Sequence, residues 1–205
     1  MSAPNTALRP DLQLIADWIT PGSRVLDLGC GQGELLAWLK THKQVKGYGV
    51  DLEVANIVAC VAAGVDAIQG DLETGLADFG DATFDHVILS QTIQAMRHTE
   101  EILNEMLRVG REAIVTFPNF GYWQNRLQIL KGHMPVSETI PFEWYNTPNI
   151  HWCMLGDFEN LCAKNGVRVA ERVVMDQGRR VHWLPNLLGS LAFYRVTRAP
   201  GRAKA

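Results

Sequence analysis

The sequence predicts an α/β fold built on a mostly parallel β-sheet. Short apolar runs typical of buried strands alternate along the chain with segments whose apolar residues recur at helical spacing. The clearest run, Val25–Leu28, stops at three alternating glycines, and Leu35, Leu36 and Leu39 then follow at helical spacing. A strand, a glycine-rich turn and a helix N-terminus in this order are typical of a nucleotide-sized pocket at the end of a parallel strand.

The remaining elements can be placed from the same two patterns. Gly64 and Gly166 end two helical segments, and Pro118 stops an apolar strand. The last strand is expected to pair with the one before it through the long connection 176–189. The expected strands cover residues 25–28, 45–50, 65–69, 83–90, 112–117, 167–175 and 190–197, and the expected helices cover 35–39, 53–63, 100–109, 122–131 and 154–165.

Composition is typical of one ordinary domain over residues 1–205. The chain has 205 residues and is 47% hydrophobic, which is enough for a sizeable core. Its net charge is −3 and it has no basic stripe that would suit a nucleic-acid backbone. No apolar run approaches the length of a membrane span, and the first residues show no apolar signal region. The four cysteines lack metal-ligand spacing, so we expect reduced thiols in a cytoplasmic protein without a bound metal.

The spacing of the glycines narrows the class of nucleotide. Gly29, Gly31 and Gly33 form G-x-G-x-G, and Glu34 stands where the dinucleotide fingerprint has its third glycine. An acidic residue at a helix start is a poor neighbour for a pyrophosphate. S-adenosylmethionine has no phosphate and carries a sulfonium and an ammonium, which suit a carboxylate such as Asp27. The run V-L-D-L-G-C-G-Q-G resembles motif I of class I S-adenosylmethionine-dependent methyltransferases.

Two further strand ends carry acidic residues in register with this turn. Asp51 lies 18 residues after Gly33, where a carboxylate can accept hydrogen bonds from both ribose hydroxyls. By the same resemblance, Asp71 would contact the adenine amino group and Leu72 would pack on the base. Each aspartate alone is more often a helix cap or a turn residue. The expected site for S-adenosylmethionine or S-adenosylhomocysteine comprises Asp27, Gly29, Cys30, Gly31, Gly33, Asp51, Leu52, Asp71, Leu72 and Ser90.

The sequence offers no convincing catalytic base after the fourth strand. Many small-molecule methyltransferases place a histidine or an acidic residue there, but Gln94 and Ala95 occupy these places and neither can accept a proton. His98 is more often a surface residue before a helix, and His86 alternates within a strand and reads as structural. The remaining candidates for a base are His133, His151 and Tyr145.

An aromatic and proline-rich insertion, residues 117–153, separates a strand from the next helix. Loops of this length tend to be lids or binding surfaces. Its aromatic side chains either pack inward over the cleft or form an interface, and Trp123, Trp144, Tyr145 and Trp152 are residue types that dominate protein interfaces.

The signatures F-P-N-F-G-Y-W-x-x-R-L, G-H-M-P and E-W-Y-N-T-P-N-I-H, with S-Q-T-I-Q-A, resemble the MetW methionine-biosynthesis family over about residues 8–197. The resemblance implies a Rossmann-like, seven-stranded class I methyltransferase fold with an antiparallel last strand. It also implies a role beside homoserine O-acyltransferase (MetX), and the family pattern does not identify a methyl acceptor. Two hypotheses follow: an accessory or regulatory protein that binds S-adenosylmethionine or S-adenosylhomocysteine and supports that acyltransferase, or a methyltransferase acting on a small molecule held under the insertion.

Overall fold

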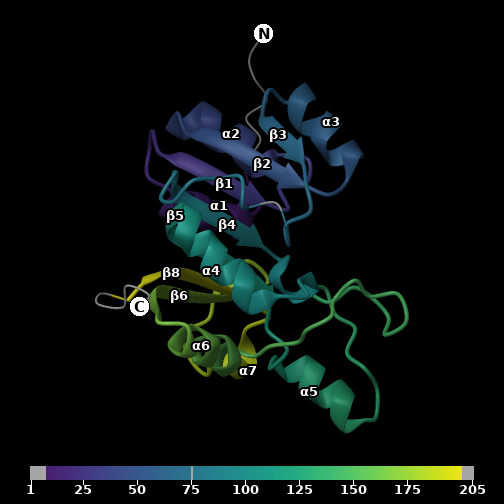
Figure 1. Cartoon of the computed structure of the whole chain (residues 1–205). Helices are drawn as coiled ribbons and strands as arrows, with labels where there is room; N and C mark the ends of the chain where they lie inside the picture. The colour runs from purple at the N-terminus through teal and green to yellow at the C-terminus, as the bar shows by residue number, and fades with distance from the viewer. Residues whose placement is uncertain (1–7, 75, 200–205) are drawn as a thin grey trace.

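The computed structural model describes residues 8–74 and 76–199, which form one mixed sheet in the order β3-β2-β1-β4-β5-β8-β6-β7 (Figure 1). The strands β1 to β5 pair in parallel, and β8 runs antiparallel to both of its neighbours, β5 and β6. The strands are β1 Arg24–Leu28, β2 Lys46–Asp51, β3 Asp66–Gln69, β4 Phe84–Ser90, β5 Gly110–Pro118, β6 Val167–Asp176, β7 Arg179–Arg180 and β8 Leu191–Arg198.

Helices cover both faces of the sheet and enclose two apolar clusters. One cluster joins α4 and α6 to the sheet through residues such as Leu103 and Phe158, and the other joins α1 and α2 through Ile15 and Leu36. Among the described residues, no helix is long and apolar enough to cross a membrane. The helices are α1 Pro10–Trp18, α2 Glu34–Lys43, α3 Val54–Ala62, α4 Thr99–Val109, α5 Trp123–Leu130, α6 Leu155–Lys164 and α7 Pro185–Leu188, with a 3₁₀ turn at Ile93–Ala95.

The sequence-based expectations for the sheet are confirmed, with one addition. Each expected strand lies within two residues of an observed one, and the last strand is antiparallel to its partners. The sheet has eight strands rather than seven because the connection 176–189 contributes β7, which is only Arg179–Arg180. The spacing of apolar residues also did not predict α1 or the four-residue helix α7.

The insertion leaves the sheet at the end of β5 and returns to it at α6. Its base is held tightly, because the buried Asn119 side chain donates hydrogen bonds to the carbonyl oxygens of Asn186 and Gly189, at 3.1 and 2.8 Å. Beyond this base, α5 lies away from the sheet (Figure 1), and the following residues to 154 have no helix or extended strand. The insertion is therefore anchored at its base and projects at its tip.

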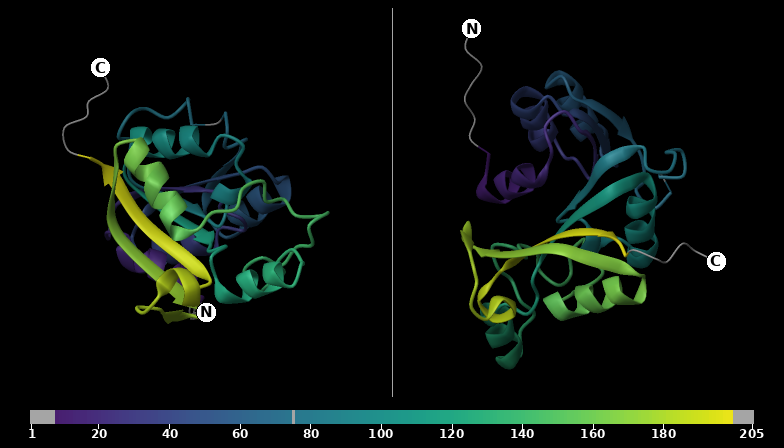
Figure 2. Two further views of the ribbon diagram at one scale, coloured as in Figure 1. Left: turned by 90° about the horizontal axis from the view of Figure 1, so that it is seen from below. Right: turned by 90° about the vertical axis from the view of Figure 1, so that its left-hand side faces the viewer.

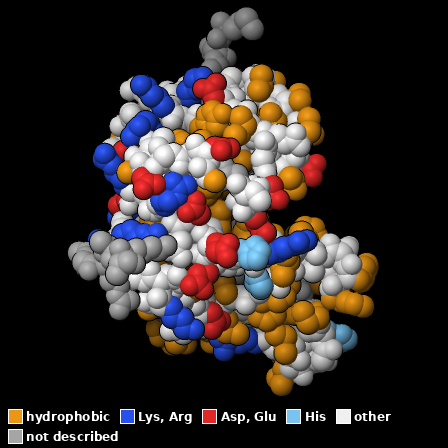
Figure 3. Space-filling model, in the orientation of Figure 1, with side chains coloured by type: hydrophobic (Ala, Val, Ile, Leu, Met, Phe, Trp, Pro, Cys, Tyr) orange, Lys and Arg blue, Asp and Glu red, His pale blue; other side chains and the backbone are white. Residues whose placement is uncertain are grey.

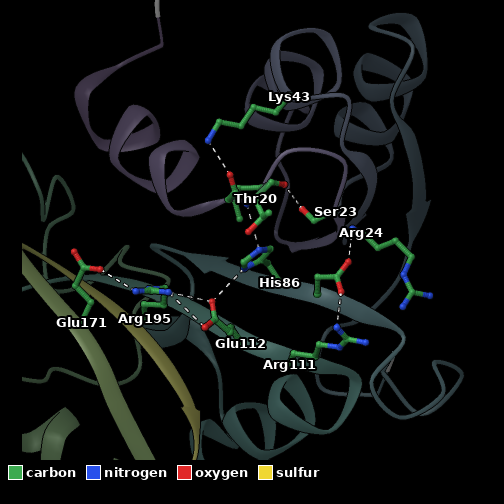
Figure 4. Close-up of polar contacts among 11 residues, drawn as sticks. Thr20, Ser23, Arg24, Lys43, His86, Arg111, Glu112, Glu171 and Arg195 are labelled. Atoms are coloured by element: carbon green, nitrogen blue, oxygen red, sulfur yellow. Dashed lines mark hydrogen bonds and ion pairs between the residues drawn. The ribbon is translucent and has the colours of Figure 1, made fainter.

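A polar network lies toward the N-terminal ends of β4 and β5 (Figure 4). His86 is buried, with Nδ1 3.5 Å from a Glu112 carboxylate oxygen. The guanidinium of Arg195 lies between two carboxylates, with nitrogens 3.4 Å from a Glu112 oxygen and 3.1 Å from a Glu171 oxygen. Burial lowers the pKa of His86, so its imidazole is neutral near pH 7. This network is at the other end of the strands from the glycine turn, which fits a structural role for His86.

Candidate functional site

The glycine turn, residues 29–33, connects β1 to α2 in a backbone conformation that requires glycine. Gly29 has φ +73°, and a Cβ at this position would lie 2.9 Å from the Thr92 hydroxyl oxygen, so both the conformation and the space exclude a side chain. The Gly29 and Cys30 amides donate hydrogen bonds to the Val50 carbonyl oxygen at 2.8 and 3.2 Å. The turn is therefore fixed against the end of β2 and against the segment after β4.

Asp51 is the side chain that joins the turn to β2 and α3. Its carboxylate accepts hydrogen bonds from the Gly31 amide at 2.9 Å and from the Glu53 amide and the Asn56 side chain at 3.0 Å each. A carboxylate has about four acceptor positions, and three of them are occupied. A ribose that bound to both oxygens would therefore have to replace at least one of these contacts.

Asp27 lies in the middle of the sheet, on the strand that leads into the turn. Its carboxyl is buried, and burial, together with the nearby negative charge of Asp51, raises its pKa to about 7. Binding and catalytic sites often contain a carboxyl group whose pKa is shifted toward neutral pH. A cation bound nearby would favour its ionised form.

Two thiols pack together at the turn, Cys30 within it and Cys60 on α3. Cys30 Sγ lies 3.8 Å from Cys60 Sγ, and the Cys60 thiol donates a hydrogen bond to the Gly31 carbonyl oxygen at 3.2 Å. All four cysteines are free. Burial raises the pKa of both thiols, so they are protonated at neutral pH and serve here as packing groups and weak donors.

The other predicted ligand residues lie at the neighbouring strand ends. Asp71 is exposed and accepts a hydrogen bond from the Glu73 amide at 3.0 Å, which is the geometry of a turn cap. Leu72 is buried in the core, whereas Leu52 is exposed. The hydroxyl of Ser90 lies 3.1 Å from that of Thr116. The contacts of Asp71 and Leu72 with an adenine, and a role of Leu52 in binding the cofactor, remain predictions.

The candidates for a base do not come together. His133 and Tyr145 lie on exposed parts of the insertion, and Tyr145 packs only edge-on against Trp144. His151 lies closer to the strand ends, because its amide donates to the Gln94 carbonyl oxygen at 3.0 Å. The His151 ring also lies beside the segment after β4, with Nε2 3.5 Å from the Arg97 carbonyl oxygen, whereas Gln94 and Ala95 in that segment carry no side chain that can act as a base.

Sequence analysis missed two groups that shape this site. Asn56 binds Asp51, and Thr92 fills the space above Gly29. Asn56 carried a usable signal, since it is the one polar side chain within the apolar run 54–62. Thr92 carried none, because a threonine in a loop has many ordinary roles.

The comparisons with known proteins identify the family. The family model described as methionine biosynthesis protein MetW matches residues 9–196. The chain belongs to the MetW family. It is 39% identical over 208 residues to the bifunctional methionine biosynthesis protein MetXA/MetW of Rhodopirellula baltica, an alignment that covers 93% of this chain and 33% of that protein. The chain thus spans about a third of the length of this relative.

Solved structures extend the likeness to the class I methyltransferase fold. A methyltransferase dependent on S-adenosylmethionine from Archaeoglobus fulgidus matches with a TM-score of 0.70 at 15% identity, covering 93% of this chain and 92% of that one. The [4+2]-cyclase SpnF matches with a TM-score of 0.67 at 16% identity, covering 93% and 81%. At these identities the likeness shows the fold alone, and the cyclase shows that different activities occur on this fold.

Proposed function

We propose that this MetW family member is an accessory subunit of methionine biosynthesis that binds S-adenosylmethionine or S-adenosylhomocysteine and associates with homoserine O-acyltransferase, MetX. The observation that carries the proposal is a glycine turn tied to Asp51, combined with Gln94 and Ala95, rather than a histidine or an acidic residue, in the segment after β4. Such a site can hold a nucleotide without transferring its methyl group. The relative from Rhodopirellula baltica supports the partner, because its name joins MetXA and MetW in one protein.

Three features of the turn suit this ligand. Gly31 has open space where a Cβ would lie, so a ligand can approach the backbone of the turn closely, and Asp51 lies beside the turn at the end of β2. Asp27 titrates near pH 7 and would ionise beside a sulfonium or an ammonium. Glu34, the first residue of α2, disfavours a phosphate at the helix start.

The tip of the insertion supplies the proposed docking surface, which we define as Trp123, Leu130, Trp144 and Tyr145. Their side chains are exposed, with Leu130 82%, Trp144 71% and Tyr145 70% accessible to solvent. Apolar side chains gather over α5 and the neighbouring loop in Figure 3, a pattern that marks association surfaces. By contrast, Phe120 and Trp152 pack on each other with ring centroids 5.1 Å apart. The insertion therefore contains aromatic side chains that pack against each other as well as aromatic side chains that are exposed.

A small-molecule methyltransferase is the second candidate function. One observation favours it: the hydrogen bond between the His151 amide and Gln94 brings a histidine to the segment that follows β4. An acceptor bound there could use His151 as its base, whereas His133 and Tyr145 are less well placed.

Two measurements test the proposal together. Calorimetric titration with S-adenosylmethionine and with S-adenosylhomocysteine should show binding to the purified protein, and a labelled-methyl screen of cell extract should yield no product at substantial turnover. A wild-type protein that binds neither nucleotide would overturn the assignment of the site. A single methylated product formed at substantial turnover would instead favour the methyltransferase.

A further inference from the structure

A cavity of about 490 Å³ lies at the opposite end of the strands from the glycine turn. Four neighbouring parallel strands each contribute their first residue to its lining, namely Arg24, Lys46, Asp66 and Phe84. In Figure 1 these strands point to the right, so the right-hand view of Figure 2 looks onto the end that carries the cavity. Ligands of open α/β sheets bind at the carboxyl ends of the strands. None of the described lining residues belongs to the set expected to hold the nucleotide, so the two sites are separate.

The cavity lies where the edge strand β3 is shorter than its neighbour β2. Tyr48 of β2 pairs with Asp66, the first residue of β3, so Lys46 and Gly47 extend beyond the end of β3. Gly47 keeps this corner narrow on one side, because a Cβ at its position would lie 2.8 Å from a methyl carbon of Leu36. The unequal strand lengths therefore leave a notch at the corner of the sheet, and the cavity occupies it.

The wall of the cavity is largely apolar and includes three aromatic rings. Phe79 packs edge-on against Phe84 and against Tyr48, with ring centroids 5.4 and 6.0 Å apart. Val45 and Val65, both buried, line the cavity as well. A further ring placed beside this series would bury apolar area and gain another edge-to-face or offset contact. The wall therefore favours a flat apolar group.

Two cations stand side by side at the cavity. Arg24 and Lys46 are partners in register on β1 and β2, so their Cα atoms lie about 5 Å apart and their side chains leave the same face of the sheet. Within residues 8–74 and 76–199, neither side chain forms an ion pair. Like charges placed directly opposite each other destabilise a sheet. An anion bound between the two side chains would remove this repulsion.

The other charged groups leave the cavity positive. Lys40 adds a third cation, whose ammonium donates one hydrogen bond to a backbone carbonyl oxygen, and Asp66 is the one carboxylate among the described lining residues. The nearby carboxylate of Asp85 accepts a hydrogen bond from the Arg24 backbone amide at 2.9 Å and pairs with Arg111 at 3.5 Å. Figure 3 shows Lys and Arg side chains gathered at its upper left, over α2 and the amino ends of the first strands. The cavity therefore favours a ligand of negative charge.

We propose that this cavity binds a small aromatic carboxylate. The ring lies against the aromatic wall, and the carboxylate meets Arg24, whose planar guanidinium matches it, and Lys46. A neutral aromatic molecule would leave the two cations uncompensated, and a small inorganic anion would leave the apolar wall uncovered. The volume of the cavity is in the range of sites that hold small organic ligands. This inference goes beyond the proposed function and does not depend on nucleotide binding.

Calorimetric titration of the purified full chain with benzoate, 1-naphthoate and indole-3-acetate tests this proposal. At least one probe should bind with a Kd below about 1 mM. The alcohol that matches this probe should bind at least about tenfold more weakly, because it loses the charge-assisted contacts. The analogue with a saturated ring should bind at least about twofold more weakly, because it loses the contacts between aromatic rings.

Variants locate the bound probe. Arg24→Gln and Lys46→Gln should each weaken binding at least about fivefold, with folding checked by circular dichroism. Lys131→Gln is the matched control, since Lys131 is an exposed lysine next to Leu130 on the proposed docking surface, the other apolar area that could hold an aromatic anion. Binding should persist when S-adenosylhomocysteine is added.

Three results would overturn this proposal. They are no binding by any of the three probes, equal losses in Arg24→Gln and Lys131→Gln, and displacement of the probe by S-adenosylhomocysteine, which would place the probe in the nucleotide site. The titration without nucleotide decides the matter if the protein binds no S-adenosylhomocysteine. Failure of the proposed function and failure of the carboxylate site are therefore separate outcomes.

Discussion

Around the glycine turn, polar groups are paired and buried, whereas at the tip of the insertion large apolar side chains face solvent. Asp51 alone receives three hydrogen bonds, and the Gly29 amide is fixed to Val50. On the insertion, Trp144 and Tyr145 pack edge-on against each other and are both largely exposed. The first region is organised for a small polar ligand before that ligand arrives, and the second has area to bury only when a partner covers it.

The largest expected effect concerns the insertion. Trp123→Ala or Trp144→Ala should weaken association with homoserine O-acyltransferase by about 2–4 kcal/mol, because truncation of an aromatic anchor removes most of the contact at its position. A pull-down combined with circular dichroism measures binding and folding for each variant. Val58→Ala is the control, since Val58 is an exposed apolar residue on α3, near the opposite edge of the sheet. If both tryptophan variants fold and bind as the wild type does, docking occurs elsewhere and the insertion is only a lid.

The next effect concerns Asp51. Asp51→Ala should weaken nucleotide binding by about 1–3 kcal/mol, the cost of leaving polar groups at the site without a partner. Because Asp51 also holds the Gly31 amide, the variant should lose part of its thermal stability as well. Calorimetry gives the first quantity and thermal unfolding the second. Unchanged affinity in a folded variant would remove Asp51 from the site.

Asp27 should make ligand binding at the turn depend on pH. Its pKa is raised to about 7 in the protein without ligand, so at pH 6 a bound cation must displace a proton from it. Affinity for S-adenosylmethionine should therefore fall as pH decreases below 7, by at most about tenfold per pH unit. Asp27→Asn should flatten this profile between pH 6 and pH 8. A wild-type profile that is already flat would contradict the role given to Asp27.

The smallest effect concerns His86. Burial lowers its pKa in the folded state, so below about pH 6.5 the unfolded chain binds a proton that the folded chain does not. Stability should accordingly fall as pH decreases through that range. Thermal unfolding between pH 5 and pH 7.5 should show a smaller loss for His86→Gln than for the wild type. An equal loss in both proteins would assign the acid sensitivity to other groups.

The same contrast explains how far sequence could predict this protein. Strong period-2 and period-3.6 patterns placed every long strand, and the glycine spacing placed the turn, because these features follow from backbone geometry. Helix α1 was missed because its N-cap, Arg9, makes no side-chain capping bond and only a proline marks its start. Two-residue β7 and four-residue α7 are too short to leave a periodic signal.

Side-chain partners were harder to predict than strand ends. The register of β1, β2 and β4 brings Asp51 to the turn. Only tertiary packing places Asn56 against Asp51 and Thr92 against Gly29. The exposure of Trp144 and the burial of Leu72 likewise depend on how the chain folds back on itself. From residue type alone, Trp144 and Leu72 are both apolar, and nothing distinguishes the exposed one from the buried one.

Size-exclusion chromatography of the purified chain mixed with purified homoserine O-acyltransferase, with and without S-adenosylhomocysteine, tests the central claim most directly. We expect a joint peak that contains both proteins, and we expect Trp144→Ala to shift it back toward the separate components. Separate elution of the two wild-type proteins under both conditions, at concentrations well above those of the pull-down, would contradict it.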